Sequence, residues 1–227
     1  MPSNGPEITL DTRAQEYAKQ LKNRSDPRGP LTYLANHGIS DREVMSRYSL
    51  GIVLDPLPGD ERFRGSISIP YIGRRGVMAV RYRCALSHDC HSVIGHSKYA
   101  QYEGSKAKLY NISAFFAAGN TIGITEGEVD AILATEVLGI PTIGLPGATQ
   151  WASYSKIWQE CFRDFDKIII FADGDDAGRS SARTIAADFG TRYTLVKCDS
   201  GEDVSSMIVN GHTDRLRRMA GVDDDEG

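Results

Sequence analysis

The pattern of apolar and polar positions in the first part of the chain predicts short helices. Residues 10–21 run without a helix breaker, and the segment 26–30, Asp-Pro-Arg-Gly-Pro, predicts the end of that helix and a loop. Ser40 is followed three residues later by Glu43, which is the spacing of a capping box. This spacing predicts a short helix over 41–48.

The periodicity then changes to that of strands. Apolar or alternating runs at 66–72 and 77–82 surround the segment 73–76, Gly-Arg-Arg-Gly, and predict a hairpin with a four-residue loop. We therefore expect residues 1–118 to form a small N-terminal domain of the α+β class.

From Gly119 onward, apolar strands alternate with helical segments. Strands are predicted at 121–125, 140–145, 167–172 and 192–196, with helices at 129–138, 151–162, 177–189, 204–210 and 213–220. Such alternation requires right-handed crossovers and produces a parallel sheet with helices on both faces. We expect an α/β domain over 119–222, followed by an acidic tail at 223–227.

Composition narrows the class of protein. With 227 residues, 41% of them hydrophobic, the chain is long enough for one good core or two small ones. It contains no run of eighteen apolar residues, and its first six residues lack the regions of a signal peptide, so we expect a cytoplasmic protein without a membrane partner. Four unevenly spaced cysteines predict free thiols or metal ligands.

The net charge of −4 hides an asymmetry along the chain. Residues 1–111 hold 16 Lys and Arg against 11 Asp and Glu, so their net charge is +5, whereas the remainder carries −9. The segment 62–108 alone has nine basic and two acidic residues. The first half therefore has the charge expected of a surface that binds a polyanion.

Acidic residues follow three of the predicted strands. Glu126 comes directly after the first strand of the α/β domain, Asp173 and Asp175 follow the strand 167–172, and Asp203 follows the last strand. Because functional groups of a parallel sheet gather at the carboxyl ends of its strands, we expect these side chains to meet.

A single acid in the first turn of a helix is explained by the helix dipole, which is worth roughly 0.3–1 kcal/mol. That explanation does not account for Asp173 and Asp175 arranged as Asp-Gly-Asp. Clustered carboxylates repel one another unless a cation binds between them, and hard oxygen ligands suit Mg²⁺ or Mn²⁺. We therefore predict a divalent metal site.

Two motifs resemble the signatures of the Toprim domain, which occurs in topoisomerases, bacterial-type primases and several nucleases. They are Glu126-Gly127-x-x-Asp130-Ala131 and Asp173-Gly174-Asp175-x-Ala177-Gly178. The resemblance spans about residues 119–210. It implies that Glu126, Asp173 and Asp175 are catalytic, and that these residues and Asp203 bind the metal.

The upstream half resembles the basic subdomain that precedes Toprim in bacterial and phage primases. The similar segments are Tyr33-Leu34-x-x-His37-Gly38-Ile39-Ser40, Leu50-Gly51, Ile69-Pro70-Tyr71, 77–83, Ser97-Lys98-Tyr99 and Lys108-Leu109-Tyr110-Asn111. The resemblance implies a DNA primase core, a nucleotidyltransferase that makes short RNA primers from ribonucleoside triphosphates on a single-stranded DNA template. In this interpretation Arg81, Arg83, Lys98 and Lys108 bind nucleotide and template.

Two departures from the primase pattern set further expectations. Primases commonly carry Asp-Pro-Asp after the last strand, whereas here Asp203-Val204-Ser205 keeps the first acid alone. The zinc ribbon that usually precedes the core has a Cys-x-x-Cys motif, which does not occur in this sequence. We expect a separately encoded zinc-binding module and a replicative helicase as partners, as in phage replication systems; a phage-encoded chain would act in the host cytoplasm.

Other functions remain open at this point. A Toprim nuclease would use the same acids to cleave nucleic acid, and a non-catalytic Toprim protein would serve as a DNA-binding or recombination factor. A topoisomerase would need a large DNA-gating domain, for which the chain has no room. The basic first half disfavours the nuclease, and the retained acids disfavour the non-catalytic factor.

A second group of candidate ligands lies in the basic half. Cys84, His88, Cys90 and His91 offer enough nitrogen and sulfur atoms for zinc, although their spacing matches no standard zinc finger. A polar loop is the alternative. Nearby, Tyr99, Tyr102 and Tyr110 alternate with lysines, which suits stacking on bases as well as burial in a core.

Overall fold

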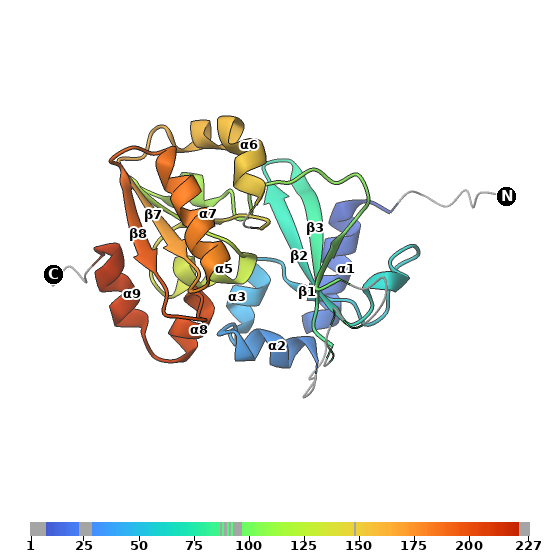
Figure 1. Ribbon diagram of the computed structural model, residues 1–227. Coiled ribbons are helices and arrows are strands. Elements are labelled where there is room, and N and C mark those ends of the chain that lie inside the picture. The colour runs from blue at the N-terminus through green and yellow to red at the C-terminus, as the bar shows by residue number, and fades with distance from the viewer. Residues whose placement is uncertain are drawn as a thin grey trace. The chain divides into compact units, whose positions relative to one another are not determined.

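The computed structural model describes residues 8–22, 29–86, 88, 90, 92, 97–147 and 149–222. The chain divides into two compact units, and each has a sheet of its own (Figure 1). Unit 1 consists of Met1–Ala35 and Ser40–Lys106, and unit 2 of Asn36–Ile39 and Ala107–Gly227. The domain boundary predicted after residue 118 stays a prediction.

The first part of the chain forms an antiparallel sheet with helices. Its elements are α1 (Leu10–Lys22), α2 (Pro30–Asn36), α3 (Arg42–Arg47), β1 (Gly51–Ile52), the 3-10 helix η1 (Glu61–Phe63), β2 (Ser66–Gly73), β3 (Gly76–Cys84) and β4 (Tyr99–Gln101). The strands lie in the order β1-β2-β3-β4. Helix α1 packs on this sheet, and its Tyr17 enters a core with Val53, Phe63, Val80 and Tyr82.

A buried carboxylate organises this core. Asp60 has no exposed surface, forms an ion pair with Arg13, and accepts hydrogen bonds from the hydroxyls of Tyr17 at 2.5 Å and Tyr102 at 2.7 Å. The hydroxyls of Tyr82 and Tyr102 are also hydrogen-bonded to each other, at 2.7 Å. Buried polar groups must be paired, and this network pairs them across η1, α1 and β3.

Two local predictions in this unit are wrong. Gly73 pairs with Gly76, so the hairpin connection is two residues long instead of four; Gly76 takes a φ of 117°, which lets the pairing continue up to the turn. The cap of α3 is Asp41 and not Ser40, because the Asp41 carboxylate accepts from the backbone N–H of Glu43 at 2.7 Å.

Four further elements of unit 1 were not predicted: α2, β1, η1 and β4. Helix α2 begins at Pro30, where a missing N–H costs nothing in the first turn of a helix. Strands β1 and β4 have two and three residues, too few for a periodicity to show in the sequence. They exist because they pair with β2 and β3.

Unit 2 has the predicted α/β architecture. Its elements are α4 (Ala114–Ala117), β5 (Thr121–Thr125), α5 (Glu128–Glu136), β6 (Thr142–Gly144), α6 (Gln150–Trp158), the 3-10 helix η2 (Gln159–Phe162), β7 (Lys167–Ala172), α7 (Asp176–Ala187), β8 (Tyr193–Lys197), α8 (Val204–Val209) and α9 (Thr213–Ala220). The four strands are parallel, in the order β6-β5-β7-β8. The predicted fold class is confirmed.

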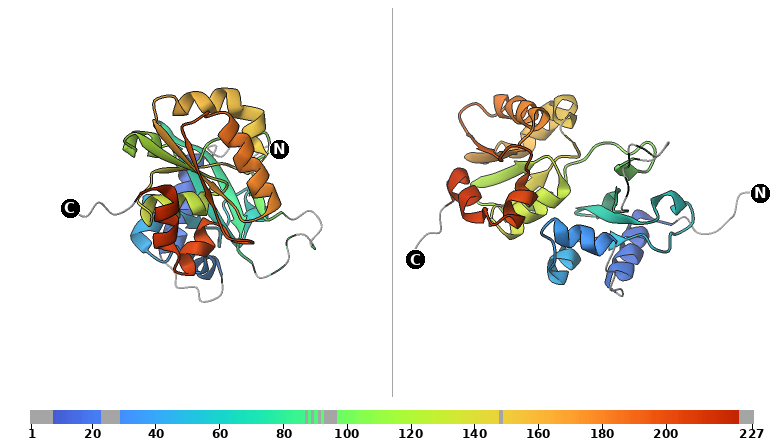
Figure 2. Two further views of the ribbon diagram at one scale, coloured as in Figure 1. Left: turned by 60° about the vertical axis from the view of Figure 1, so that its left-hand side comes forward. Right: turned by 60° about the horizontal axis from the view of Figure 1, so that its bottom comes forward.

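Alternate residues of β7 face two separate cores. Ile168 and Ile170 pack with residues of α6, η2 and α7, while Ile169 and Phe171 pack with residues of α5, α8 and α9. Helices therefore cover both faces of the sheet (Figure 2). A strand buried on both faces explains the run of three isoleucines in its sequence. In the described part of the chain, no helix is both long and apolar enough to cross a membrane.

Candidate functional site

The carboxyl ends of β5 and β7 bring the first two acids together. These strands are neighbours in the sheet, and Ile124 of β5 pairs with Ile170 of β7. Glu126 lies two residues beyond the first of these positions, and Asp173 lies three residues beyond the second. The two carboxylates consequently repel each other, as do Asp173 and Asp175.

Gly174 brings the loop after β8 to the same place. Its N–H donates to the carbonyl of Glu202 at 2.7 Å, and its carbonyl accepts from the N–H of Gly201 at 3.1 Å. A Cβ atom at position 174 would lie 1.6 Å from the carbonyl oxygen of Asp199, so a larger residue does not fit. The glycine of Asp-Gly-Asp thus joins two loops, and Asp203 lies close enough to Asp173 for their charges to repel.

Asp175 and Asp203 each begin a helix as well as facing the site. The Oδ1 atom of Asp175 accepts from the N–H of Gly178 at 2.7 Å, at the start of α7. The Oδ1 atom of Asp203 accepts from the N–H of Ser206 at 2.7 Å, and the hydroxyl of Ser206 accepts from the N–H of Asp203, which completes a capping box. Each cap uses Oδ1, and none of the described hydrogen bonds reaches the second oxygen of either carboxylate.

Asp130 belongs to this cluster, although the sequence analysis gave it no role. It is 9% exposed, and its Oδ1 accepts from the N–H of Ser205 at 2.8 Å. Burial, together with the charges of Asp203 and Asp173, raises the pKa of Asp130 well above its usual value. Asp130 ties the first turn of α5 to the first turn of α8, and so positions Asp203. Asp130 lies four residues, about one helical turn, after Glu126, and this spacing could have indicated from the sequence that the two side chains lie near each other.

The pKa values of Asp173 and Glu126 are also raised. Burial raises the pKa of Asp173 to about 7, and the charges of Glu126, Asp203 and Asp175 add to the effect. Burial, and then the charge of Asp175, raise the pKa of Glu126, although a hydrogen bond with Ser181 opposes this. Such groups regain their charge when a cation binds beside them.

The donor atoms fit a divalent cation. The Oε1 atom of Glu126 is buried without a hydrogen-bond partner, and none of the described hydrogen bonds reaches the carboxylate of Asp173. Among the described residues, no three of these acids bring their oxygens within 4.8 Å of one another. The described acids therefore do not form a closed cage, so an ion held here would take further ligands from water or phosphate, as Mg²⁺ commonly does.

Arg83 is placed differently from an exposed DNA-binding residue. It is 9% exposed, with its guanidinium 4.8 Å from the ring centre of Tyr33 and 5.1 Å from that of Tyr99. It donates to the carbonyl of Cys84 at 2.5 Å and to that of Lys98 at 3.5 Å. These contacts favour a structural role that joins β3 to β4.

The other predicted basic residues are more accessible. Arg81 lies 4.4 Å from the ring centre of Tyr99, Lys98 is exposed, and Lys108 is half-buried in unit 2. Of the tyrosines considered for base stacking, Tyr102 belongs to the Asp60 network and Tyr110 is 2% exposed. Both are core residues.

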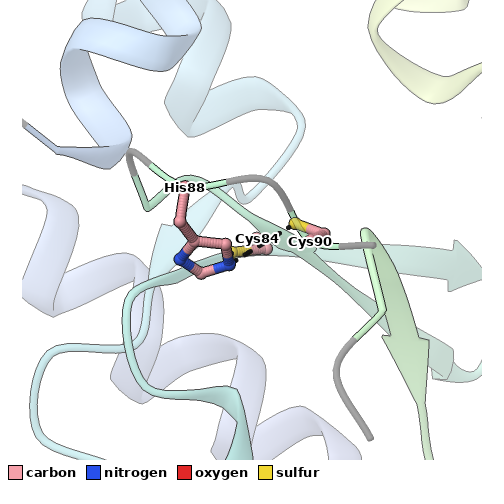
Figure 3. Close-up of side chains that lie close together, drawn as sticks. All are labelled: Cys84, His88 and Cys90. Carbon is pink, nitrogen blue, oxygen red and sulfur yellow. Dashed lines mark hydrogen bonds between the residues drawn. The ribbon is translucent and has the colours of Figure 1, made fainter. Parts of the chain in front are cut away.

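The predicted sulfur and nitrogen ligands also come together, in unit 1. Cys84, His88 and Cys90 point toward one another at the end of β3 (Figure 3), and their ligand atoms all lie within 4.8 Å. His91, the fourth residue of that prediction, lies outside the described residues.

The chain is similar to a phage protein. The gene 57 protein of Mycobacterium phage D29 is 35% identical over 159 residues, which are 68% of this chain and 97% of that protein. No protein-family model matches the chain.

The fold is similar to that of bacterial primases. A crystal structure of the Aquifex aeolicus primase, with its zinc-binding and RNA polymerase domains, matches with a TM-score of 0.72 at 20% identity; the match covers 93% of this chain and 59% of the primase. The RNA polymerase domain of the primase DnaG from Mycobacterium tuberculosis, bound to a double-stranded DNA oligomer with a 6-nucleotide overhang, matches with a TM-score of 0.70 at 18% identity. That match covers 92% of this chain and 77% of the domain.

Proposed function

The chain belongs to the family of the gene 57 protein of Mycobacterium phage D29, and from this relationship and its DnaG-like fold we propose that it is a DNA primase core. In this proposal it joins ribonucleoside triphosphates into short RNA primers on a single-stranded DNA template. It is then a DNA-directed RNA polymerase of the primase type.

One observation carries the proposal: carboxylates from three loops of a primase-like fold converge on one edge of a parallel sheet. Glu126, Asp175 and Asp203 lie near enough for their charges to raise the pKa of Asp173, and Asp173 has no hydrogen-bond donor among the described residues. A purely structural cluster of acids would be paired with donors or with bases. Among the described residues Asp173 lacks that pairing, which is the state expected of a metal ligand.

These four acids would hold Mg²⁺ or Mn²⁺, with Glu126, Asp173 and Asp175 as the catalytic residues. When bound, the ion would neutralise charge on the triphosphate and make the attacking 3′-hydroxyl easier to deprotonate. The protein holds the carboxylates in place. Gly174 joins the loops that carry Asp173 and Asp203, and Asp130 orients the start of α8. Asp173 must give up its proton before it can act as a ligand, so activity should rise with pH near its pKa of about 7.

The path of DNA is proposed to follow bases that are exposed or half-buried. Arg81, Lys98 and Lys108 are the candidates, and Arg83 is left out because its guanidinium is already bonded to backbone carbonyls. The DnaG domain from M. tuberculosis was crystallised with DNA, which supports DNA as a ligand of this fold.

Salt dependence tests that path. Replacing Arg81, Lys98 and Lys108 with Gln should shallow the slope of log K against log salt by roughly 0.7 for each single-strand phosphate that is no longer neutralised. The control variant replaces three exposed basic residues of unit 2 with Gln, namely Lys156, Arg163 and Arg218. It should leave the slope unchanged. An equal effect of both triples would place the DNA elsewhere.

Two alternatives use the same acids differently. A Toprim nuclease would cleave nucleic acid, and a non-catalytic recombination factor would bind DNA without chemistry. The primase match extends over 93% of the chain and includes unit 1, which a stand-alone Toprim nuclease lacks. The carboxylate of Asp173, which has no donor among the described residues, speaks against a binding protein without metal.

Incubation with single-stranded DNA, labelled ribonucleotides and Mg²⁺ or Mn²⁺ distinguishes the three functions. We expect short RNA products that depend on template and nucleotides. Cleaved DNA without RNA synthesis would overturn the proposal in favour of a nuclease. DNA binding with neither product would favour the recombination factor.

Partners are proposed on the same basis. A separately encoded zinc-binding module and a replicative helicase would help this core to start primers. Holding two nucleotides and a template together for the first bond has a large entropic cost, so extension of an added oligoribonucleotide should be faster than initiation. Equal rates in the isolated chain would show that these residues suffice for initiation.

A further inference from the structure

Three soft-donor side chains meet where β3 ends and the connection to β4 begins. The Nε2 atom of His88 lies 3.7 Å from the Sγ atom of Cys84 and 3.6 Å from the Sγ atom of Cys90. All three ligand atoms are within 4.8 Å of one another, and Figure 3 shows the side chains converging from one short segment. Both cysteines are free thiols.

These distances are those of ligands that share one zinc ion. Zn–S bonds of about 2.3 Å and Zn–N bonds of about 2.05 Å, at tetrahedral angles, separate nitrogen from sulfur by about 3.6 Å. Both nitrogen-to-sulfur distances agree with that value to within about 0.1 Å. Two thiolates and one imidazole also form a donor set that selects zinc over the hard cations of the acidic site.

Hydrogen bonds link the three side chains in the metal-free chain, including one between Cys84 and Cys90, but the contacts of His88 exceed what its ring nitrogen can serve. A neutral imidazole nitrogen carries either one hydrogen or one lone pair, and it can serve one thiol well but not two. The two sulfurs nevertheless lie at nearly the same distance from Nε2 of His88. A cation shared by three ligands requires such symmetry.

Hydrogen bonds to backbone carbonyls already join the first and last residues of the connection between β3 and β4. The N–H of Cys84 donates to the carbonyl of Lys98 at 3.0 Å, and Arg83 donates to the carbonyls of both residues. The next residues lie against β2, since the N–H of Ala85 donates to the carbonyl of Gly65 at 3.3 Å. An ion held by Cys84 is therefore fixed to the sheet through β3.

We propose that Cys84, His88 and Cys90 are ligands of one Zn²⁺ ion. Its role is structural: it fixes the start of the connection to β3. The site is separate from the four acids, and the inference does not depend on the proposed catalytic activity.

Metal content of the full chain tests the proposal. Protein purified without chelators should contain one zinc ion per chain by elemental analysis. Replacement by Co²⁺ should give sulfur-to-cobalt charge-transfer absorption and the visible bands of a tetrahedral site, which carboxylate ligands do not produce. A wild-type chain that binds no zinc, or cobalt spectra without thiolate absorption, would overturn it.

Variants assign the ligands. Cys90→Ser and His88→Ala change side chains that are half-buried and exposed, so the fold should survive. Each should weaken zinc binding by more than the roughly 10–100-fold that loss of an outer partner costs. Cys161→Ser alters an exposed thiol in η2 and is the matched control. Zinc affinity equal to that control in both ligand variants would overturn the site, while Asp173→Asn should leave zinc content unchanged.

Discussion

Asp60 in unit 1 is fully buried and Asp173 in unit 2 is half-buried, and the neighbours of these two carboxylates differ in kind. Asp60 is surrounded by partners: a guanidinium and two tyrosine hydroxyls reach its oxygens. The neighbours of Asp173 are other carboxylates, and the charges of Glu126, Asp203 and Asp175 oppose its ionisation. Burial alone therefore does not identify a functional acid, whereas the type of neighbour does.

The tyrosines around Asp60 support this distinction. Burial raises the pKa of Tyr102 to about 12, and the hydrogen bond with Asp60 adds to the rise. The pKa of Tyr17 is raised by burial and then by Asp60 as well. Both hydroxyls stay protonated and serve as donors, so the network is complete without a ligand. Asp173 has no such donor among the described residues, and the proposed metal ion would compensate its charge.

Removal of one site carboxylate should have the largest effect. Asp173→Asn and Asp175→Asn should each lower primer synthesis more than about tenfold, because a missing metal ligand costs several kcal/mol in the transition state. Asp176→Asn is the matched control, since Asp176 is exposed in the same loop and pairs with Arg179. Rates are measured with labelled ribonucleotides on single-stranded DNA.

Stability should change in the opposite sense to activity. In the metal-free chain, Asp173→Asn removes charge repulsion and should leave the melting temperature unchanged or raise it. A variant that keeps more than about a tenth of the wild-type rate would remove Asp173 from the metal site.

Removal of the paired carboxylate should instead affect folding. Asp60→Ala leaves Arg13 and two tyrosine hydroxyls without their acceptor, which should lower the free energy of unfolding by roughly 3–5 kcal/mol. Chemical denaturation measures this. Glu103→Ala, which changes an exposed acid of the same unit, should be close to neutral. A decrease below about 1 kcal/mol for Asp60→Ala would mean that water replaces the carboxylate in the network.

The two units also differ in how well their sequences predict them. In unit 2, strand β7 and helix α9 have the predicted limits, because a strand buried on both faces and a short helix between polar loops leave clear patterns. In unit 1, β1 and β4 are defined by pairing with distant residues, which local periodicity does not contain. Short edge strands are set by the tertiary structure.

Some residues of the candidate site could also be proposed from the sequence, and others could not. Glu126, Asp173, Asp175 and Asp203 could be proposed from the sequence, because the ends of parallel strands meet. The role of Asp130 depends on α8 lying beside α5, and the burial of Arg83 depends on two tyrosine rings; neither is visible in a count of charges. Asp60 gave no signal at all, since an isolated aspartate in a loop looks exposed.

The pH dependence of stability should sharpen the comparison further. The pKa of Asp173 rises from 3.8 to about 7 on folding, so between these values the folded chain keeps a proton that the unfolded chain has released. This group therefore stabilises the metal-free chain at low pH relative to high pH, and its contribution falls as pH rises toward about 7.

Thermal melts of wild type and Asp173→Asn at several pH values measure the effect. The melting temperature of the variant relative to wild type should rise between about pH 4 and pH 7 and then level off. Added Mg²⁺ at the upper end should stabilise the wild type and not the variant. A constant difference across this range would mean that Asp173 has an ordinary pKa and is not crowded by acids.

The smallest effect should come from Asp203, which combines both kinds of carboxylate in one residue. Its Oδ1 atom accepts from the N–H of Ser206 and from the hydroxyl of Ser205, whereas its charge acts on Asp173 and Asp130. Asp203→Asn keeps an oxygen for the cap and should leave stability nearly unchanged, while Asp203→Ala removes the cap of α8 and should lower the free energy of unfolding by about 1 kcal/mol.

Mg²⁺ binding, measured by calorimetry, should weaken in both Asp203 variants, because neither carries the negative charge. If Asp203→Asn binds Mg²⁺ as tightly as wild type, Asp203 is a cap alone, and the metal site consists of the acids that follow β5 and β7.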